Sequence, residues 1–304
     1  MSSTVTLRGA GTALVTPFRP DGSIDEPCFR RLVARQVEAG IRLLIPCGTT
    51  GESATLSFEE RERLVKAALA ECGSTALVVA GTGSNDTRQA VEQAKRAADW
   101  GAHAVLSLAP PYNKPPQDAL IDHFSAVAEG AGVPVIVYNV PGRVGVNVEA
   151  ATILTLAKVP GIAAVKEASA NMSQCMTILR EKPEGFTFLS GEDALTLAFL
   201  AMGGDGVISV IGNEAPADIT KLVAHGLAGR FAEARDIHER LLPLMDANFC
   251  ESNPIPVKHA MAVMGLCENV LRRPLRPLAA GRHAVLESAL AVAGLLERSA
   301  TAAS

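Results

Sequence analysis

Short apolar runs recur at regular intervals along the first two thirds of the chain. Several of them, such as 133–138, are apolar at nearly every consecutive position instead of alternating with polar residues. That pattern is typical of parallel strands buried on both faces. It predicts eight strands, at residues 11–18, 41–47, 76–81, 104–109, 133–139, 162–167, 186–191 and 206–211.

The stretches between these runs carry apolar residues spaced three and four apart, which predicts an amphipathic helix after each strand. Phe29 and Leu32 belong to the first such stripe, and Gly40 is placed to end that helix. Ser57 and Glu60 form a capping box at the start of the second helix. Later helices are predicted at about 117–130, 147–158, 171–182, 193–203 and 215–228.

Eight strands that alternate with helices predict a (β/α)8 TIM barrel, with a doubly wound open sheet as the alternative. After about Gly229 the strand pattern stops, and helices are predicted at 231–246, 255–265 and 279–298. We therefore expect a barrel catalytic domain over residues 1–229 and a C-terminal helical domain over residues 230–304. The last residues, 299–304, are expected to be frayed.

Composition narrows the class of protein. The 304 residues are 48% hydrophobic with a net charge of −4, which is ordinary for a soluble globular protein and argues against nucleic-acid binding. No apolar run has the roughly 18–20 residues of a membrane span, and the start lacks a secretion signal. The cysteines form no C-x-x-C pair, which indicates reduced thiols in the cytoplasm. The histidines lack H-x-H or H-E-x-x-H spacing, so no metal site is expected.

A TIM barrel carries its functional residues at the carboxyl ends of the strands. Lys166 is the one lysine that directly extends an apolar strand run. In apolar surroundings a lysine is partly neutral and becomes nucleophilic towards carbonyl groups. The alternative is a solvated lysine that opens a loop.

Hydroxyl groups end the neighbouring strands. The chain has two tyrosines, Tyr112 and Tyr138, and they follow the fourth strand and end the fifth. Either could be core filler, because buried phenols are common. A Schiff-base reaction, however, requires a proton donor and acceptor beside the lysine. Thr49 and Thr50, after the second strand, would complete a hydroxyl relay.

Arg143 follows the fifth strand in a turn that begins with Pro141 and Gly142. Taken alone it is better explained as a surface arginine. Beside a lysine that attacks 2-oxo acids, it becomes a candidate fork for a carboxylate. Close backbone approach to a small ligand is expected at glycines 48, 51 and 191.

These residues together resemble the pyruvate-dependent class I aldolase family, which includes N-acetylneuraminate lyase. The resemblance covers nearly the whole chain, from residues 11–18 to 253–258, and rests on the motifs at 48–53, 112–114, 138–143, 165–167 and 206–210. Within the family it is strongest to the branch that condenses pyruvate with L-aspartate 4-semialdehyde in lysine and diaminopimelate biosynthesis. It implies a Schiff-base lyase.

The resemblance also implies a role for each residue. The catalytic residues would be Lys166 as the Schiff-base lysine, Tyr138 as the main acid and base, and Thr49 and Tyr112 in a proton relay, with Tyr112 reaching into a neighbouring subunit. The substrate-binding residues would be Thr50, Gly191 and Ile208 for pyruvate and Arg143 for the aldehyde's carboxylate. No separate cofactor, a cytoplasmic location and a homotetramer built as a dimer of dimers are implied as well.

Some positions depart from the family pattern. Pro111 replaces a tyrosine that is common beside the relay tyrosine, and Val144 stands where a threonine often follows the arginine. Phe58, Arg61 and Gln89 fall where lysine-inhibited members tend to carry histidine, histidine and glutamate. A cationic Arg61 and the missing carboxylate should weaken capture of a lysine ammonium, so we expect little feedback inhibition by L-lysine.

Two alternative functions would share parts of this pattern. Within the family, a 2-keto-3-deoxy sugar acid aldolase or an N-acetylneuraminate lyase-like enzyme would share the lysine and the tyrosine. Arg143 and the intact motif at 48–53 favour a short, carboxylated aldehyde instead. Outside the class, the chain would be a non-catalytic barrel that binds a metabolite. Retention of Lys166, both tyrosines and both threonines argues against that alternative.

Overall fold

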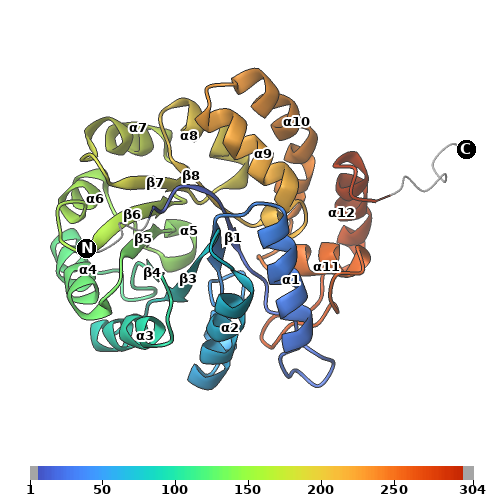
Figure 1. The fold of residues 1–304 in the computed structure, drawn as a ribbon, viewed down its shortest axis with the longest axis horizontal. Coiled ribbons are helices and arrows are strands. Elements are labelled where there is room, and N and C mark those ends of the chain that lie inside the picture. The colour runs from blue at the N-terminus through green and yellow to red at the C-terminus, as the bar shows by residue number, and fades with distance from the viewer. Residues whose placement is uncertain (1–5, 297–304) are drawn as a thin grey trace, which may run out of the picture.

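The computed structural model describes residues 6–296. Eight parallel strands form a closed barrel in which each strand pairs with the next and β8 pairs back to β1 (Figure 1). The (β/α)8 prediction is confirmed, and the open-sheet alternative is wrong. The strands are β1 (Gly9–Ala13), β2 (Leu43–Ile45), β3 (Leu77–Thr82), β4 (Ala104–Leu108), β5 (Val135–Asn139), β6 (Ile162–Glu167), β7 (Thr187–Ser190) and β8 (Gly206–Ser209).

Helices surround the barrel in the order that the sequence predicted. They are α1 (Glu26–Glu38), α2 (Phe58–Glu71), α3 (Thr87–Asp99), α4 (Gln117–Ala131), α6 (Ala150–Leu156), α7 (Met172–Glu181), α8 (Thr196–Ala201) and α9 (Pro216–Leu227). The capping box at Ser57 and Glu60 is present at the start of α2. A further short helix, α5 (Pro141–Val144), carries Arg143 where the sequence predicted only a turn.

Strands β1 and β2 end earlier than predicted, because the residues that follow each strand do not continue its hydrogen-bond pattern. After β1, the backbone N–H of Val15 donates to the side chain of Asn213 instead of continuing the ladder. After β2, Pro46 has no N–H to donate, and Cys47 adopts a left-handed backbone with φ of 59°. Both strands therefore end early and release the chain into loops at the same end of the barrel.

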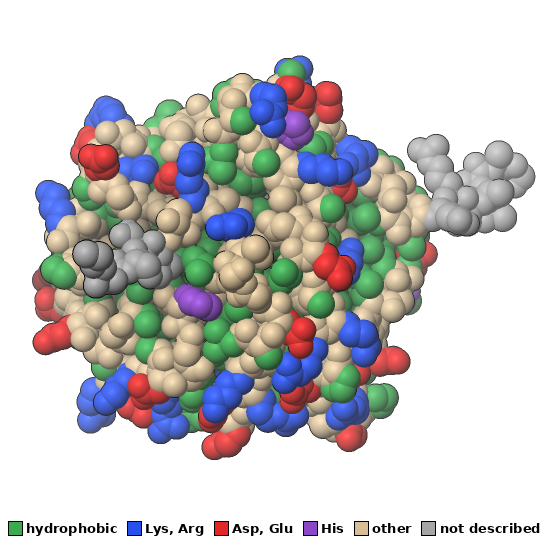
Figure 2. Space-filling model, in the orientation of Figure 1, with side chains coloured by type: hydrophobic (Ala, Val, Ile, Leu, Met, Phe, Trp, Pro, Cys, Tyr) green, Lys and Arg blue, Asp and Glu red, His purple; other side chains and the backbone are tan. Residues whose placement is uncertain are grey.

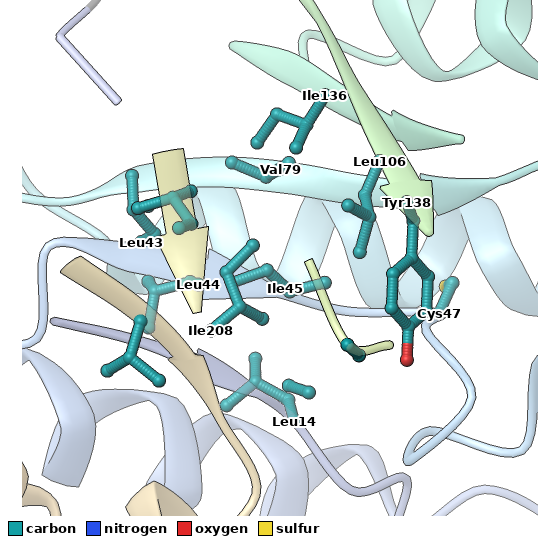
Figure 3. Packing of buried hydrophobic residues seen from close by; sticks show 14 of the residues in the cluster. Leu14, Leu43, Leu44, Ile45, Cys47, Val79, Leu106, Ile136, Tyr138 and Ile208 are labelled. Carbon is teal, nitrogen blue, oxygen red and sulfur yellow. The ribbon is translucent and has the colours of Figure 1, made fainter. Parts of the chain in front are cut away.

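Apolar side chains fill the barrel interior beneath those loops. Figure 3 shows Leu43, Val79, Ile136 and Ile208 within this cluster. Tyr138 is also a member, and its ring places a hydroxyl at the edge of the apolar region. The interior is thus a packed core, which leaves the carboxyl ends of the strands as the place for a site.

Three helices follow the barrel and lie together at one side of it in Figure 1: α10 (Phe231–Ala247), α11 (Ile255–Val263) and α12 (Ala280–Val292). Helix α10 packs against α9 and α12, and buried leucines of α10 and α12 belong to the same apolar cluster as the barrel. The predicted helix at 279–298 is shorter, since Gly294 adopts a left-handed φ of 75°. The division into domains at 229/230 stays a prediction, and residues 299–304 lie outside the described part.

The surface is mixed in charge. On the face drawn in Figure 2, basic and acidic side chains are interspersed, in keeping with the small net charge. Within residues 6–296, no helix is both long and apolar enough to cross a membrane.

A buried ion pair joins the barrel to α11. The Lys258 ammonium lies 2.7 Å from the Glu52 carboxylate, and both side chains are almost completely buried. The other Glu52 oxygen accepts from the backbone N–H of Arg272 at 2.9 Å. The Lys258 ammonium also lies 4.3 Å from the centroid of the Phe18 ring. Because Glu52 belongs to the loop after β2, this pair fixes that loop against the C-terminal helices.

Replacing Lys258 with methionine would leave the Glu52 carboxylate buried without its partner. We expect the free energy of unfolding to fall by about 3–5 kcal/mol, because an uncompensated buried charge is costly. Urea unfolding followed by circular dichroism measures the change. Lys66→Met is the matched control, since the Lys66–Glu62 pair is exposed, and it should change stability by at most about 0.5 kcal/mol. Similar small effects of both variants would contradict the structural importance of this pair.

Candidate active site

A cavity opens at the carboxyl ends of the strands. Its walls come from β5, β6, the loop after β2, α5 and the segment after α10. A second, more open hollow adjoins it and shares five lining residues with it, namely Val140, Arg143, Glu192, Phe249 and Asn253. The two form one site, with an inner part at Lys166 and an outer part around Arg143.

Lys166 lies in β6 directly opposite Tyr138 in β5. Its side chain is buried, and its amine is 4.4 Å from the centroid of the Tyr138 ring. Burial lowers the pKa of Lys166 to about 8, with a small further lowering by Arg143, while the carboxylates of Asp193 and Glu192 act in the opposite direction. An amine with that pKa is partly neutral near pH 7 and is therefore a usable nucleophile.

Tyr138 has the opposite behaviour. Burial raises the pKa of its phenol to about 12, with Glu192 adding to the rise and Arg143 opposing it. The phenol therefore keeps its proton at neutral pH. A protonated hydroxyl beside a partly neutral amine is the pair that acid–base steps at a carbonyl carbon require.

Two carboxyl groups flank the amine, and the sequence analysis gave them no role. Asp193 is buried, and one of its oxygens accepts from the backbone N–H groups of Val210 and Ile211 at 2.9 and 3.0 Å. Burial raises the pKa of both Asp193 and Glu192. Glu192 comes just after β7, so the rule that polar groups follow strand ends was a signal that pointed to it.

Asn253 is a third residue that the sequence analysis did not place in the site. Its side-chain amide donates to the Thr50 hydroxyl at 2.9 Å, and its backbone carbonyl accepts from the Arg143 guanidinium at 3.2 Å. It lies 203 residues from Thr50 and 110 from Arg143, so no local pattern marks it. One residue of the C-terminal segment thus holds two of the predicted substrate-binding side chains.

Packing also accounts for two of the predicted glycines. A Cβ atom on Gly191 would lie 2.6 Å from the Ala168 Cβ, and one on Gly51 would lie 3.0 Å from the Leu14 carbonyl. Packing against neighbouring strand ends therefore requires glycine at both positions without any ligand. Gly48 has more room, since the nearest atom to an added Cβ is 3.6 Å away.

Most of the predicted site residues meet in this cavity: Lys166, Tyr138, Thr49, Thr50, Arg143 and Gly191 all line it. Ile208 lies deeper, in the barrel core, and Val210 lines the wall on that strand's continuation. Tyr112 is 87% exposed with a left-handed φ of 72°, and it is not among the lining residues. Across residues 6–296, Thr49 makes no side-chain hydrogen bond to either tyrosine, so one chain does not by itself assemble the relay.

The donor set of the cavity does not suit a metal. Its lining residues include no histidine, and burial raises the pKa of the lining thiol of Cys47 to about 12. A protonated thiol is a poor metal ligand. What the cavity offers is one buried amine, one phenol, hydroxyl groups and a guanidinium, a set that fits carbonyl chemistry on carboxylated substrates.

Comparison with known proteins gives one family. The model of the dihydrodipicolinate synthetase family matches residues 6–293. A 4-hydroxy-tetrahydrodipicolinate synthase from Chlorobium limicola is 51% identical over 295 residues, which is 97% of this chain and 100% of that protein. The solved dihydrodipicolinate synthase from Thermotoga maritima has a TM-score of 0.93 at 41% identity, covering 95% of this chain and 99% of that one. A structure described as a monomeric dihydrodipicolinate synthase variant reaches a TM-score of 0.93 at 40% identity, covering 95% and 97% of the two chains.

The amine of Lys166 should titrate near pH 8. Its neutral, reactive fraction increases as pH rises through the pKa, so acetylation by acetic anhydride should reach half its limiting rate near pH 8. Lys66 is exposed and serves as the control lysine in the same sample. Peptide mass mapping after timed reaction at each pH follows both residues in one sample. Equal profiles for the two lysines would contradict the desolvation of Lys166.

Proposed function

The chain belongs to the dihydrodipicolinate synthetase family, and we propose that it acts as a 4-hydroxy-tetrahydrodipicolinate synthase. It is then a Schiff-base lyase that condenses pyruvate with L-aspartate 4-semialdehyde on the route to lysine and diaminopimelate. The observation that carries the proposal is the buried amine of Lys166, held against the Tyr138 ring at the carboxyl end of β6. The resemblance inferred from the motifs is confirmed by the family match.

The reaction begins with the amine of Lys166. Its neutral form attacks the C2 carbonyl of pyruvate, and the carbinolamine that results loses its hydroxyl as water to give an iminium. Tyr138, protonated at neutral pH, supplies the proton to the departing hydroxyl. Loss of a proton from the pyruvate methyl group then converts the iminium to an enamine, and the phenolate is the nearby base.

The enamine carbon attacks the aldehyde carbon of the semialdehyde, and the aldehyde oxygen takes a proton. The amino group of the semialdehyde then adds to C2 and displaces the Lys166 amine, which closes the ring and frees the enzyme. The iminium formed on Lys166 accepts the electron pair when the methyl proton is lost, so the reaction we propose uses no separate cofactor.

Two groups hold the substrate carboxylates in this proposal. Thr50 and the backbone amides beside it bind pyruvate, with Gly191 and Ile208 contributing through their backbones. Arg143, in the outer part of the cavity, binds the carboxylate of the semialdehyde as a charge-assisted fork. Support comes from Asn253, which contacts both Thr50 and Arg143 and so fixes the span between the two anion sites.

Tyr112 and Thr49 belong to the proposal as relay residues, with Tyr112 acting in a neighbouring subunit. The Tyr112 side chain is exposed, and its backbone is left-handed. Because it does not pack inside its own chain, it is available to contact a second subunit. We propose a homotetramer built as a dimer of dimers and working in the cytoplasm. A dihydrodipicolinate synthase variant described as monomeric has the same fold, so the fold alone does not determine the number of subunits.

Borohydride trapping with pyruvate tests the chemistry. We expect a pyruvyl adduct on the peptide that contains Lys166 and none in Lys166→Ala. In Arg143→Ala the adduct should form as before, while turnover of L-aspartate 4-semialdehyde should fall about 10–100-fold, the loss expected from removing a hydrogen bond to a charged group.

Arg88→Ala is the matched control, because the Arg88 side chain is 94% exposed and does not line the cavity. It should leave trapping and turnover intact. Folded wild-type protein without an adduct would overturn the Schiff-base mechanism. An adduct combined with full turnover in Arg143→Ala would overturn only the assignment of Arg143.

L-Lysine should inhibit the enzyme weakly. A hollow contains positions where lysine-inhibited members carry polar residues. It is lined by Phe58, Asp86, Arg88, Gln89 and Glu92. Its two carboxylates are each paired with an arginine. Glu92 pairs with Arg96 at 2.6 Å and Asp86 with Arg88 at 3.5 Å. A steady-state assay at low-millimolar L-lysine should therefore retain most of the activity, and Gln89→Glu should increase sensitivity. Strong inhibition of the wild type would contradict this prediction.

A further inference from the structure

Two residues of the sequence motifs have no role in the reaction proposed above. Asn139 follows Tyr138 in β5, and Glu167 follows Lys166 in β6. Both side chains are completely buried, and neither lines the cavity. Successive side chains of a strand point to opposite faces, so these two face the surrounding helices while the phenol and the amine face the barrel interior. Tyr138 and Ile136, two residues apart in β5, both belong to the apolar cluster of that interior (Figure 3).

The carboxylate of Glu167 accepts hydrogen bonds from the neighbouring strand, from the loop after β6 and from α7. The Asn139 amide donates to its two oxygens at 3.2 and 2.9 Å and so bridges β5 and β6. The backbone N–H of Ser169 donates to one oxygen at 2.6 Å, and the side-chain amide of Gln174, in α7, donates to the other at 3.1 Å. Each oxygen thus accepts two hydrogen bonds, and a carboxylate is the side chain that can accept at both ends.

The Asn139 side chain is also fixed from the outside of the barrel. Its amide oxygen accepts from the backbone N–H of Val148 at 2.9 Å, and its nitrogen donates to Asn147 Oδ1 at 2.9 Å. The Asn147 amide in turn donates to Gln174 at 2.8 Å. The segment before α6 and helix α7 therefore hold Asn139 and Glu167 in place behind the Tyr138 and Lys166 side chains.

The pairing of β5 with β6 contains a bulge. The register shifts by one residue between Val135 and Ile136, which leaves Ala163 as an extra residue in β6. The backbone ladder thus tolerates an offset of one residue between these two strands. A further constraint has to select the register beyond the bulge.

A slip of one residue beyond the bulge would reverse the two faces of β6. Glu167 would then point into the barrel, and the Lys166 amine would face the helices. The slip would also separate Glu167 from its hydrogen-bond donors, and a buried polar group without partners is costly. Selecting one register is the best attested use of buried polar groups. In the observed register Asn139 lies directly opposite Glu167.

We propose that Asn139 and Glu167 are positioning residues, which select the register of β5 and β6 that brings the Lys166 amine against the Tyr138 ring. The inference rests on the proposed function, since it gives these two residues their part in forming the Schiff base. The amine lies 4.4 Å from the ring centroid in this register. Hydrogen bonds on the outer face of the two strands thus determine the geometry on the inner face.

Glu167→Gln tests the assignment. The variant replaces one acceptor oxygen with an NH2 group, which then faces N–H donors. We expect the Lys166 amine to become more exposed to water in the folded variant. Its acetylation by acetic anhydride should reach half the limiting rate at least about one pH unit above the wild-type point near pH 8. Pyruvate trapping at pH 7 should slow by more than about tenfold.

The direction of the shift separates positioning from a direct effect of charge. Removing a nearby carboxylate would lower the pKa of the lysine, whereas loss of burial raises it. The charged groups that act on the amine, Asp193, Glu192 and Arg143, are unchanged in the variant. Circular dichroism checks that the variant is folded. A half-rate point that stays near pH 8 or falls in folded Glu167→Gln would overturn the assignment.

Glu149→Gln is the matched control, because it makes the same replacement at an exposed position next to Val148. Its half-rate point should stay near pH 8. If Glu167→Gln does not fold, Asn147→Ala decides the question, since Asn147 is only half-buried and holds the Asn139 amide from outside. Its half-rate point should rise by about 0.5 pH unit, and an unchanged point would contradict the positioning role.

Acetylation requires no pyruvate, so it measures the position of the Lys166 amine independently of the reaction. Folded wild-type protein that forms no pyruvyl adduct would overturn the proposed function. The acetylation profiles of wild type and Glu167→Gln would still decide whether Glu167 sets the register. The two failures are therefore distinguishable.

Discussion

Pairing of β8 with β1 closes the sheet, and the position of every group in the candidate site follows from that closure. A closed barrel has a packed apolar interior, so the strand ends are the only place where polar side chains can converge above it. In the register of β5 and β6, Tyr138 and Lys166 lie directly opposite each other at that level. The same closure keeps water from the lysine amine. Burial then outweighs the attraction of two nearby carboxylates and lowers the pKa of the amine.

The C-terminal helices complete what the barrel begins. Asn253 contacts both Thr50 and Arg143, while Lys258 neutralises Glu52 in the loop that carries Thr49 and Thr50. Each contact joins residues that are more than one hundred positions apart in the chain. The segment after the barrel is therefore a structural part of the site. These two residues connect the C-terminal segment to the loop after β2.

Different parts of the site have different electrostatic demands. The inner part needs low polarity, because an amine and a phenol must exchange protons near neutral pH. The outer part carries the positive charge of Arg143 beside Glu192, which suits the anionic substrate of the proposed reaction. The barrel separates the two by placing one on a strand and the other on the short helix α5 that follows.

The barrel, the order of its elements and the residues at the strand ends can all be predicted from the sequence. Burial on both faces leaves a continuous apolar pattern, and a polar residue that ends such a run, as Lys166 does, is readable without a structure. Which distant side chains lie next to one another in the site depends on the three-dimensional fold. Asn253 and Asp193 carry no local pattern, because their partners come from other elements. The close packing at Gly51 and Gly191 also depends on the fold, since the atoms that an added Cβ would meet belong to neighbouring strand ends.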